Sequence, residues 1–224
     1  MATGFDRLAP HYRWMERVLA GSKLQHCRIA FLDTIPAPRR VLLLGEGNGR
    51  FLVELVRAHP RASFMCVDGS VRMLDCARAQ LQACGLNGDA VQFIHADVLN
   101  WSPPAEQFDL IVSHFFLDCF RRDQLEKIVP VIGALATREA RWLLADFREP
   151  PKGWMKWRAR LILGLMYLFF RRVTRLPAGS LTPPDGLLMA SGFVLRERRL
   201  FDWGLLHSDL WVKEGDFLTT DASG

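Results

Sequence analysis

The chain has 224 residues, of which half are hydrophobic and 24% are charged. This balance is typical of a globular protein and excludes a disordered or fibrous chain. The length suits one large α/β domain that can fold without a disulfide or metal staple. The formal net charge is +5, and the basic excess gathers at residues 148–175, where eight Lys and Arg residues accompany Glu149 alone. A protein that follows a nucleic-acid backbone usually needs a broader basic surface, so no nucleic-acid partner is expected.

Five cysteines occur without a Cys-x-x-Cys pair and without a His spacing suited to zinc. They are interpreted as reduced thiols, and no metal site is predicted. The first residues lack the apolar core of a signal peptide. The longest apolar run, residues 161–170, is far shorter than the roughly 20 residues that a bilayer-spanning helix needs. We therefore expect a cytoplasmic protein with no membrane span.

Residues 4–35 are expected to form an amphipathic helical segment that ends before Pro36. Strand-like and helix-like segments then alternate. Short apolar runs predict strands, and apolar residues at helical spacing predict the helices between them; the strands are 41–44, 63–67, 91–94, 108–112 and 141–145, and the helices are 50–59, 70–84 and 121–137. This order predicts a doubly wound α/β fold, a parallel sheet with helices on both faces.

The second half of the chain departs from this alternation. A basic and aromatic segment extends to about residue 175, and a short helix near 186–190 precedes strands near 193–201 and 208–213. No convincing linker interrupts the chain. We expect a single domain with four parts: an N-terminal helical cap (1–38), a cofactor-binding core (39–147), a basic aromatic helical cap (148–190) and C-terminal strands (191–224).

A glycine cluster, Gly45-Glu46-Gly47-Asn48-Gly49, closes the first strand and opens the first helix. Glycines at this place let the backbone turn sharply and approach a ligand closely. A dinucleotide fingerprint would place its third glycine at position 50, which is Arg50. The spacing therefore favours a nucleoside-type ligand over NAD, although a tight strand–helix turn alone would also use glycine.

Acidic residues follow the next two strands. Asp68 ends the second strand about twenty residues beyond the glycine cluster, and Asp97 ends the third. An acid at the first of these places can accept hydrogen bonds from ribose hydroxyls. Either acid alone could instead cap a helix or a turn. Because ligands bind at the carboxyl ends of parallel strands, signals at consecutive strand ends together predict a binding site.

The order of these motifs resembles the class I S-adenosylmethionine-dependent methyltransferases. The matching segments are VLLLGEGNGR (41–50), FMCVDGS (64–70), HADV (95–98) and FDLIVSHFF (108–116). The resemblance implies a Rossmann-like, seven-stranded sheet with an antiparallel last strand, and S-adenosylmethionine as the cofactor. Within the motifs it implies cofactor contacts by Gly45, Gly47 and Gly49 at the methionine part, by Asp68 at the ribose and by Asp97 at the adenine. Gly69, Ser70, Val98 and Ser113 are the further residues expected to contact the cofactor.

Two features extend or modify the resemblance. Glu46 occupies a place often held by a small residue or Cys, and we expect it to bind the positively charged end of the cofactor. The opening from Phe5 to Tyr12 resembles the FDxxAxxYD segment of quinone-ring methyltransferases, with Arg13 in place of the final Asp. By that resemblance Tyr12 touches the cofactor; the alternative is a packing helix with Tyr12 at its surface.

His114 follows the fourth strand, where the family presents groups to the substrate. Methyl transfer requires a deprotonated nucleophile, and histidine has a suitable intrinsic pKa for a base near neutral pH. His114 is thus the candidate catalytic residue, with packing beneath the cofactor as the alternative. Asp118 could orient His114 or cap the helix that follows.

The basic aromatic segment 152–175 has three interpretations: core packing with a solvated charged face, a lid over an apolar substrate, and peripheral contact with a membrane surface. The function predicted overall is methyl transfer from S-adenosylmethionine to a small, apolar, aromatic methyl acceptor. The alternatives are an RNA or protein methyltransferase and a non-catalytic, membrane-peripheral S-adenosylmethionine-binding protein. Homo-oligomerisation is left open.

Overall fold

The computed structural model describes residues 22–174 and 181–214. Within them, seven strands form one sheet in the order β3-β2-β1-β4-β5-β7-β6. The strands are β1 (Arg40–Leu44), β2 (Ser63–Asp68), β3 (Val91–His95), β4 (Phe108–His114), β5 (Ala136–Phe147), β6 (Phe193–Phe201) and β7 (Leu206–Lys213). Neighbours from β3 to β5 pair in parallel, and β7 is antiparallel to both β5 and β6. The predicted Rossmann-like sheet with an antiparallel last strand is confirmed.

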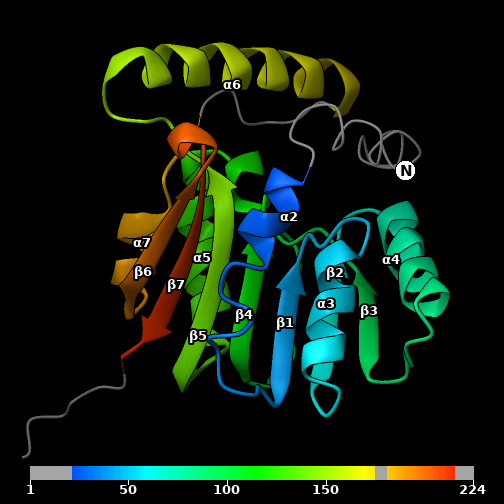
Figure 1. Cartoon of the computed structure of the whole chain (residues 1–224). Helices are drawn as coiled ribbons and strands as arrows, with labels where there is room; N and C mark the ends of the chain where they lie inside the picture. The colour runs from blue at the N-terminus through cyan, green and yellow to red at the C-terminus, as the bar shows by residue number, and fades with distance from the viewer. Residues whose placement is uncertain (1–21, 175–180, 215–224) are drawn as a thin grey trace, which may run out of the picture.

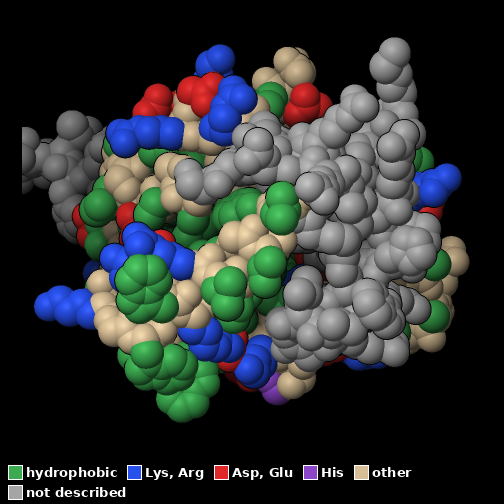
Figure 2. All heavy atoms as spheres, turned by 90° about the horizontal axis from the view of Figure 1, so that it is seen from above, with side chains coloured by type: hydrophobic (Ala, Val, Ile, Leu, Met, Phe, Trp, Pro, Cys, Tyr) green, Lys and Arg blue, Asp and Glu red, His purple; other side chains and the backbone are tan. Residues whose placement is uncertain are grey.

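Helices cover both faces of this sheet (Figure 1). The helices are α2 (Lys23–Arg28), α3 (Arg50–Ala58), α4 (Val71–Ala83), α5 (Arg122–Ala134), α6 (Gly153–Thr174) and α7 (Asp185–Ala190), with 3₁₀ turns η1 (Leu117–Cys119) and η2 (Asp202–Gly204). Helix α6 crosses above the edge at which the parallel strands end (Figure 1), and Figure 2 shows the molecule from that side. Among the described helices, none combines the length and the hydropathy needed to cross a bilayer.

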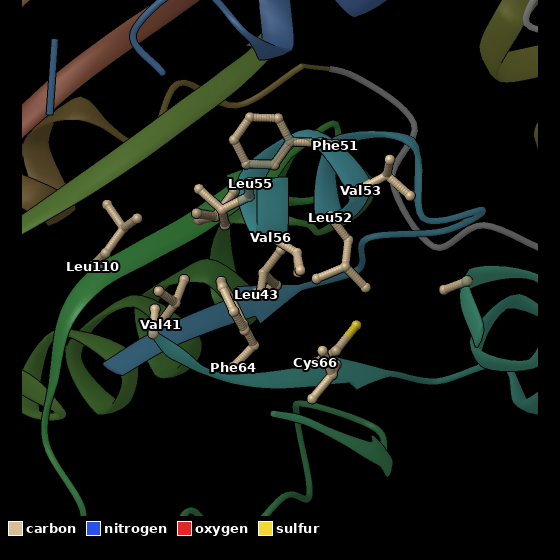
Figure 3. Packing of buried hydrophobic residues seen from close by; sticks show 14 of the residues in the cluster. Val41, Leu43, Phe51, Leu52, Val53, Leu55, Val56, Phe64, Cys66 and Leu110 are labelled. Atoms are coloured by element: carbon tan, nitrogen blue, oxygen red, sulfur yellow. The ribbon is translucent and has the colours of Figure 1, made fainter. Parts of the chain in front are cut away.

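The strands place alternate side chains on opposite faces of the sheet, and each face has its own hydrophobic core. Val41 and Leu43 of β1 pack with Phe51, Leu52 and Leu55 of α3 (Figure 3). Leu42 and Leu44 point to the other face and pack with Leu125, Ile128, Val129 and Ile132 of α5. Continuous apolar runs such as 41–44 are therefore buried on both sides, as expected for a central parallel strand.

Two predicted helices are shorter than expected. Within the predicted segment 4–35, the described part is helical only to Arg28, and hydrogen-bonded turns follow that bury Phe31 and Ile35 against α3 and β1. The helix predicted at 121–137 ends at Ala134. Ala136 instead pairs with Phe108 at the start of β5. Tertiary packing and strand pairing override the local helical pattern at both places.

Candidate active site

The turn between β1 and α3 is left-handed at three glycines. Gly45, Gly47 and Gly49 have φ angles of 63°, 68° and 80°, which residues with a Cβ rarely adopt. A Cβ on Gly45 would lie 2.2 Å from the ring of Phe116, and one on Gly49 would lie 2.7 Å from the Cα of Ala77 in α4. The turn therefore requires glycine for its own conformation and packing, and it opens at the edge where the strands end.

Glu46 caps helix α3. Its Oε1 accepts hydrogen bonds from the backbone N–H groups of Phe51 and Leu52, each at 2.9 Å. Burial raises the pKa of Glu46 to about 7, although these bonds and the Arg28 guanidinium lower it. A cation placed beside Glu46 would favour the ionised form and lower this raised pKa. The expected contact of Glu46 with the cofactor stays a prediction.

Asp68 connects the loops that follow β1 and β2 through hydrogen bonds. Its carboxylate accepts hydrogen bonds from the backbone N–H groups of Gly47 (3.3 Å) and Ser70 (2.8 Å). Its carbonyl accepts from the N–H of Ala96 after β3 (3.1 Å). The structure thus brings together three of the strand ends that the sequence analysis singled out, with Asp68 between them.

The neighbouring predicted contacts have local structural roles. Ser70 is buried, and its hydroxyl accepts from the N–H of Met73 to cap α4. The Gly69 carbonyl lies 3.2 Å from Nε2 of His95. Asp97 is exposed, and its carboxylate accepts from the N–H of Leu99 and the side chain of Asn100. Val98 packs against the core on the α5 side.

Ser113 and His114 point to opposite faces of β4. The Ser113 hydroxyl is buried and accepts a hydrogen bond from Nε1 of Trp142 at 2.8 Å. The His114 ring is also buried and meets the edge of the Phe51 ring at 4.5 Å between centroids. Burial, with the Arg28 charge, holds its pKa well below the usual range. Neither ring nitrogen has a hydrogen-bond partner among the described residues. Tyr12 lies outside the described residues.

The expected roles of Asp118 are corrected. Its backbone N–H donates to Oδ2 of Asp146 at 3.1 Å. The residue that caps α5 is Arg121, whose backbone N–H donates to Oε1 of Gln124. Burial raises the pKa of Asp118 to about 6. Burial and the neighbouring Asp118 hold the pKa of Asp146 well above its usual range. Both carboxyl groups therefore hold a proton more tightly than a solvated aspartic acid does.

A cavity of about 400 Å³ lies between α6 and the adjoining ends of β5 and β7. Its lining combines apolar and charged side chains, including Phe147, Leu163, Tyr167, Asp146 and His207. Asp146 and His207 are directly paired across β5 and β7. In the described part of the chain, no group of His, Cys, Asp and Glu side chains could hold a metal ion.

His207 belongs to a row of hydrogen-bonded side chains that also includes Asp209 and Arg198. Its Nδ1 lies 2.9 Å from Oδ1 of Asp209, and Arg198 donates to both oxygens of Asp209 at 2.7 and 2.6 Å. The charges of these partners hold the pKa of Asp209 below its usual range, although burial opposes the shift. The sequence analysis missed this row. The sequence did contain a signal for this row, because His207 and Asp209 are polar residues at alternate positions of the last strand and therefore lie on one face of it.

The comparisons with known proteins agree with this geometry. Residues 41–137 match a family model described as a methyltransferase domain. The chain is similar to a demethylmenaquinone methyltransferase of Deinococcus radiodurans, with 28% identity over 93% of this chain and 89% of the relative. It is also similar to a trans-aconitate 2-methyltransferase of an Acidovorax species, with 35% identity over 35% of this chain and 28% of the relative.

Solved structures share the fold. An O-methyltransferase family protein from Burkholderia thailandensis superposes with a TM-score of 0.69 at 18% identity, over 94% of this chain and 62% of that structure. An N-methyltransferase, NodS from Bradyrhizobium japonicum, superposes with a TM-score of 0.55 at 15% identity, over 92% of this chain and 97% of that structure. The chain therefore spans about three fifths of the length of the first of these structures and nearly all of the second.

The match of residues 41–137 to a methyltransferase domain, the methyltransferase relatives and the shared sheet together support the class I S-adenosylmethionine-dependent methyltransferases as the group this chain is similar to. The residues at the edge fit that cofactor, because the left-handed glycine turn, the half-buried Asp68 carboxylate and the proton-responsive Glu46 suit a ligand with hydroxyl groups and a cationic end. The cofactor would supply a methyl group on a sulfonium, and the protein would orient the methyl acceptor and take up the proton that its nucleophilic atom loses.

The predicted contact between Glu46 and the ammonium group of the cofactor can be tested by ligand binding alone, without an assay of methyl transfer. At pH 7, binding of S-adenosylhomocysteine should release a fraction of a proton if its ammonium group lies beside Glu46, because a nearby cation lowers the raised pKa. Calorimetry in two buffers of different ionisation enthalpy measures this release. Glu46→Gln keeps an oxygen to cap α3 and should lose the release. Equal proton release by wild type and Glu46→Gln would contradict the predicted contact.

Proposed function

We propose that this methyltransferase methylates a small, apolar, aromatic compound held in the cavity beneath α6. The observation that carries the proposal is the cavity itself, which is lined by Asp146 and Phe147 at the end of β5 and by Leu163 and Tyr167 of α6. A volume of about 400 Å³ is in the range of small-molecule sites. In this proposal the inward face of α6 is the lid that the sequence analysis considered.

The names of the relatives support a small methyl acceptor. One relative is named for demethylmenaquinone, and solved neighbours include a mitomycin 7-O-methyltransferase and a family protein in complex with apigenin. Trans-aconitate, named in another relative, is the competing kind of methyl acceptor, a small acid. The cavity lining also includes Arg148, Arg160 and Arg198, whose positive charges would suit the carboxylates of such an acid.

The proposal assigns the cofactor to the edge at β1–β4. It keeps the contacts expected from the sequence, which are Tyr12, Gly45, Glu46, Gly47, Gly49, Asp68, Gly69, Ser70, Asp97, Val98 and Ser113. For Ser70 and Ser113 the contact would come from the backbone, because each hydroxyl is engaged within the protein. The proposal also includes the cytoplasm as the location, where thiols such as the five of this chain stay reduced.

His207 is the side chain of the cavity best placed to take the proton of the methyl acceptor. Its Nδ1 faces the Asp209 carboxylate, so the tautomer with hydrogen on Nδ1 leaves Nε2 as an acceptor. The proton passes to Nε2 as the acceptor atom forms its bond to the methyl carbon. His114, on the other side of β4 with a lowered pKa, is the weaker candidate.

The cofactor site is tested with Asp68→Asn, which keeps the shape of the side chain and removes its charge. We expect S-adenosylhomocysteine to bind about 10- to 100-fold more weakly, the scale for losing a charged hydrogen-bond partner. Asp75→Asn, on the exposed side of α4, is the matched control. Wild-type affinity in a folded Asp68→Asn protein, measured by calorimetry, would remove Asp68 from the site.

The methyl acceptor is tested with labelled S-adenosylmethionine and a panel of phenols, quinols, thiols, trans-aconitate and total RNA. The proposal predicts transfer to a phenol or a quinol. Transfer to RNA alone would replace the small-molecule function by the nucleic-acid alternative.

With the methyl acceptor found by that panel, the two histidines can be compared directly. His207→Gln should lower turnover by about 10²- to 10⁴-fold and leave the affinity for S-adenosylhomocysteine unchanged. The loss should shrink for methyl acceptors that are already ionised at the assay pH. If His114→Gln shows this dependence on the methyl acceptor's pKa and His207→Gln does not, His114 is the base.

A further inference from the structure

Helix α6 has a second apolar face that points away from the protein. Its inward face buries Ala159, Leu163, Met166 and Tyr167. On the opposite side lie five large apolar residues, each between 52% and 71% exposed, which we call the outer stripe: Trp154, Trp157, Leu161, Leu165 and Leu168. Their spacing of three and four residues sets them in one row along the helix. Contiguous exposed apolar surface of this kind marks an interaction site.

A strained turn adds a third tryptophan to this surface. Asp202 and Trp203 have φ angles of 46° and 58°, in the left-handed region that costs free energy for residues with a Cβ. The turn is held by Asp202, which bonds Lys23 and Arg158. It leaves Trp203 64% exposed, with its ring 5.7 Å from that of Trp154. The fold thus maintains an exposed pair of indole rings at one end of the outer stripe.

The surroundings of the outer stripe are cationic. Lys152 is exposed at the start of α6. Glu149 is shared by Lys156 and Arg160, and Asp202 is shared by Lys23 and Arg158, so each acid neutralises only one of its two cations. Figure 2 shows Lys and Arg side chains beside hydrophobic ones on this side of the molecule. A positive surplus around an apolar stripe complements a negatively charged surface.

We propose that the outer stripe of α6, together with Trp203, docks on an anionic lipid bilayer. A helix with Trp and Leu on one face and flanking Lys and Arg lies in the plane of the headgroups, where tryptophan rings are favoured. A second copy of the chain would bring the same positive surplus to this surface, so it complements the surface less well than an anionic bilayer does. Helix α6 then contacts the bilayer with one face and closes the cavity with the other.

This docking gives the methyl acceptor a route. An apolar compound dissolved in the bilayer would reach the cavity beneath α6 without crossing bulk water. That second step rests on the proposed function, whereas the docking itself does not.

The test measures binding of the full chain to vesicles of phosphatidylglycerol and phosphatidylcholine, and to vesicles of phosphatidylcholine alone, by co-sedimentation. We expect the anionic vesicles to bind more tightly and the binding to weaken as salt is raised. Lys152→Gln should weaken binding to the anionic vesicles by about fivefold and should change binding to the neutral vesicles little. The double variant Trp157→Gln with Leu161→Gln should weaken anionic binding by at least about tenfold, because less apolar surface enters the bilayer.

The matched control is Val131→Gln with Met189→Gln, which changes two exposed apolar residues on α5 and α7. It should bind vesicles within about twofold of the wild type. S-adenosylhomocysteine affinity, measured on every variant, should stay unchanged and shows that each one is folded.

If the wild type does not bind anionic vesicles, or if the double variant binds them as tightly as the wild type, the docking is wrong. A dimer that the double variant abolishes, without vesicle binding, would make the outer stripe a subunit interface. Loss of docking with cofactor binding intact leaves the proposed function standing.

Discussion

Burial of the sheet on both faces is the constraint on which the site depends. Side chains from β1, β2 and β4 alternate between the α3–α4 core and the α5–α7 core, so neither face of the central strands offers room for a ligand. Polar groups can therefore gather only where the strands end. The Asp68 carboxylate uses this edge to bind the backbone of two loops at once. That arrangement holds the glycine turn and the β2–α4 loop in a fixed relation.

The edge divides into two regions of different chemistry. Around β1–β3 the polar groups are mostly backbone amides and partly exposed acids, which suit a hydrophilic nucleoside. Around β5 and β7 they are buried and paired: Asp118 with Asp146, and His207 with Asp209 and Arg198. Charges buried in this way are costly unless they are paired or neutralised. Of these residues, Asp146, His207 and Arg198 line the cavity beneath α6.

The first region could be predicted from the sequence because its signals are local. Gly45 to Gly49, Asp68 and Asp97 each follow a strand within a few residues, and the parallel order brings those ends together. The second region could not be predicted in the same way. Asp146 and His207 are 61 residues apart in the sequence, and only the register of β5 against β7 makes them neighbours. The same rule of acids at strand ends would have identified Asp146, but not its partner.

Helix α6 shows a different limit of sequence analysis. Its apolar residues lie on two sides, and the spacing alone does not say which side faces the protein. Packing of Leu163 and Tyr167 over the cavity settles the choice and leaves Trp157 and Leu161 outside. His114 shows the same limit, because a histidine after β4 has a suitable intrinsic pKa for a base until burial against Phe51 lowers it.

The central claim is that the cofactor occupies the part of the edge formed by β1, β2, β3 and β4 and leaves the cavity beneath α6 to the methyl acceptor. Hydrogen–deuterium exchange with and without S-adenosylhomocysteine tests it most directly. The claim predicts slower exchange at residues 45–52, 68–71 and 95–99, with little change in β6 and β7. Protection confined to β7 and the inner face of α6, with the glycine turn unchanged, would contradict it.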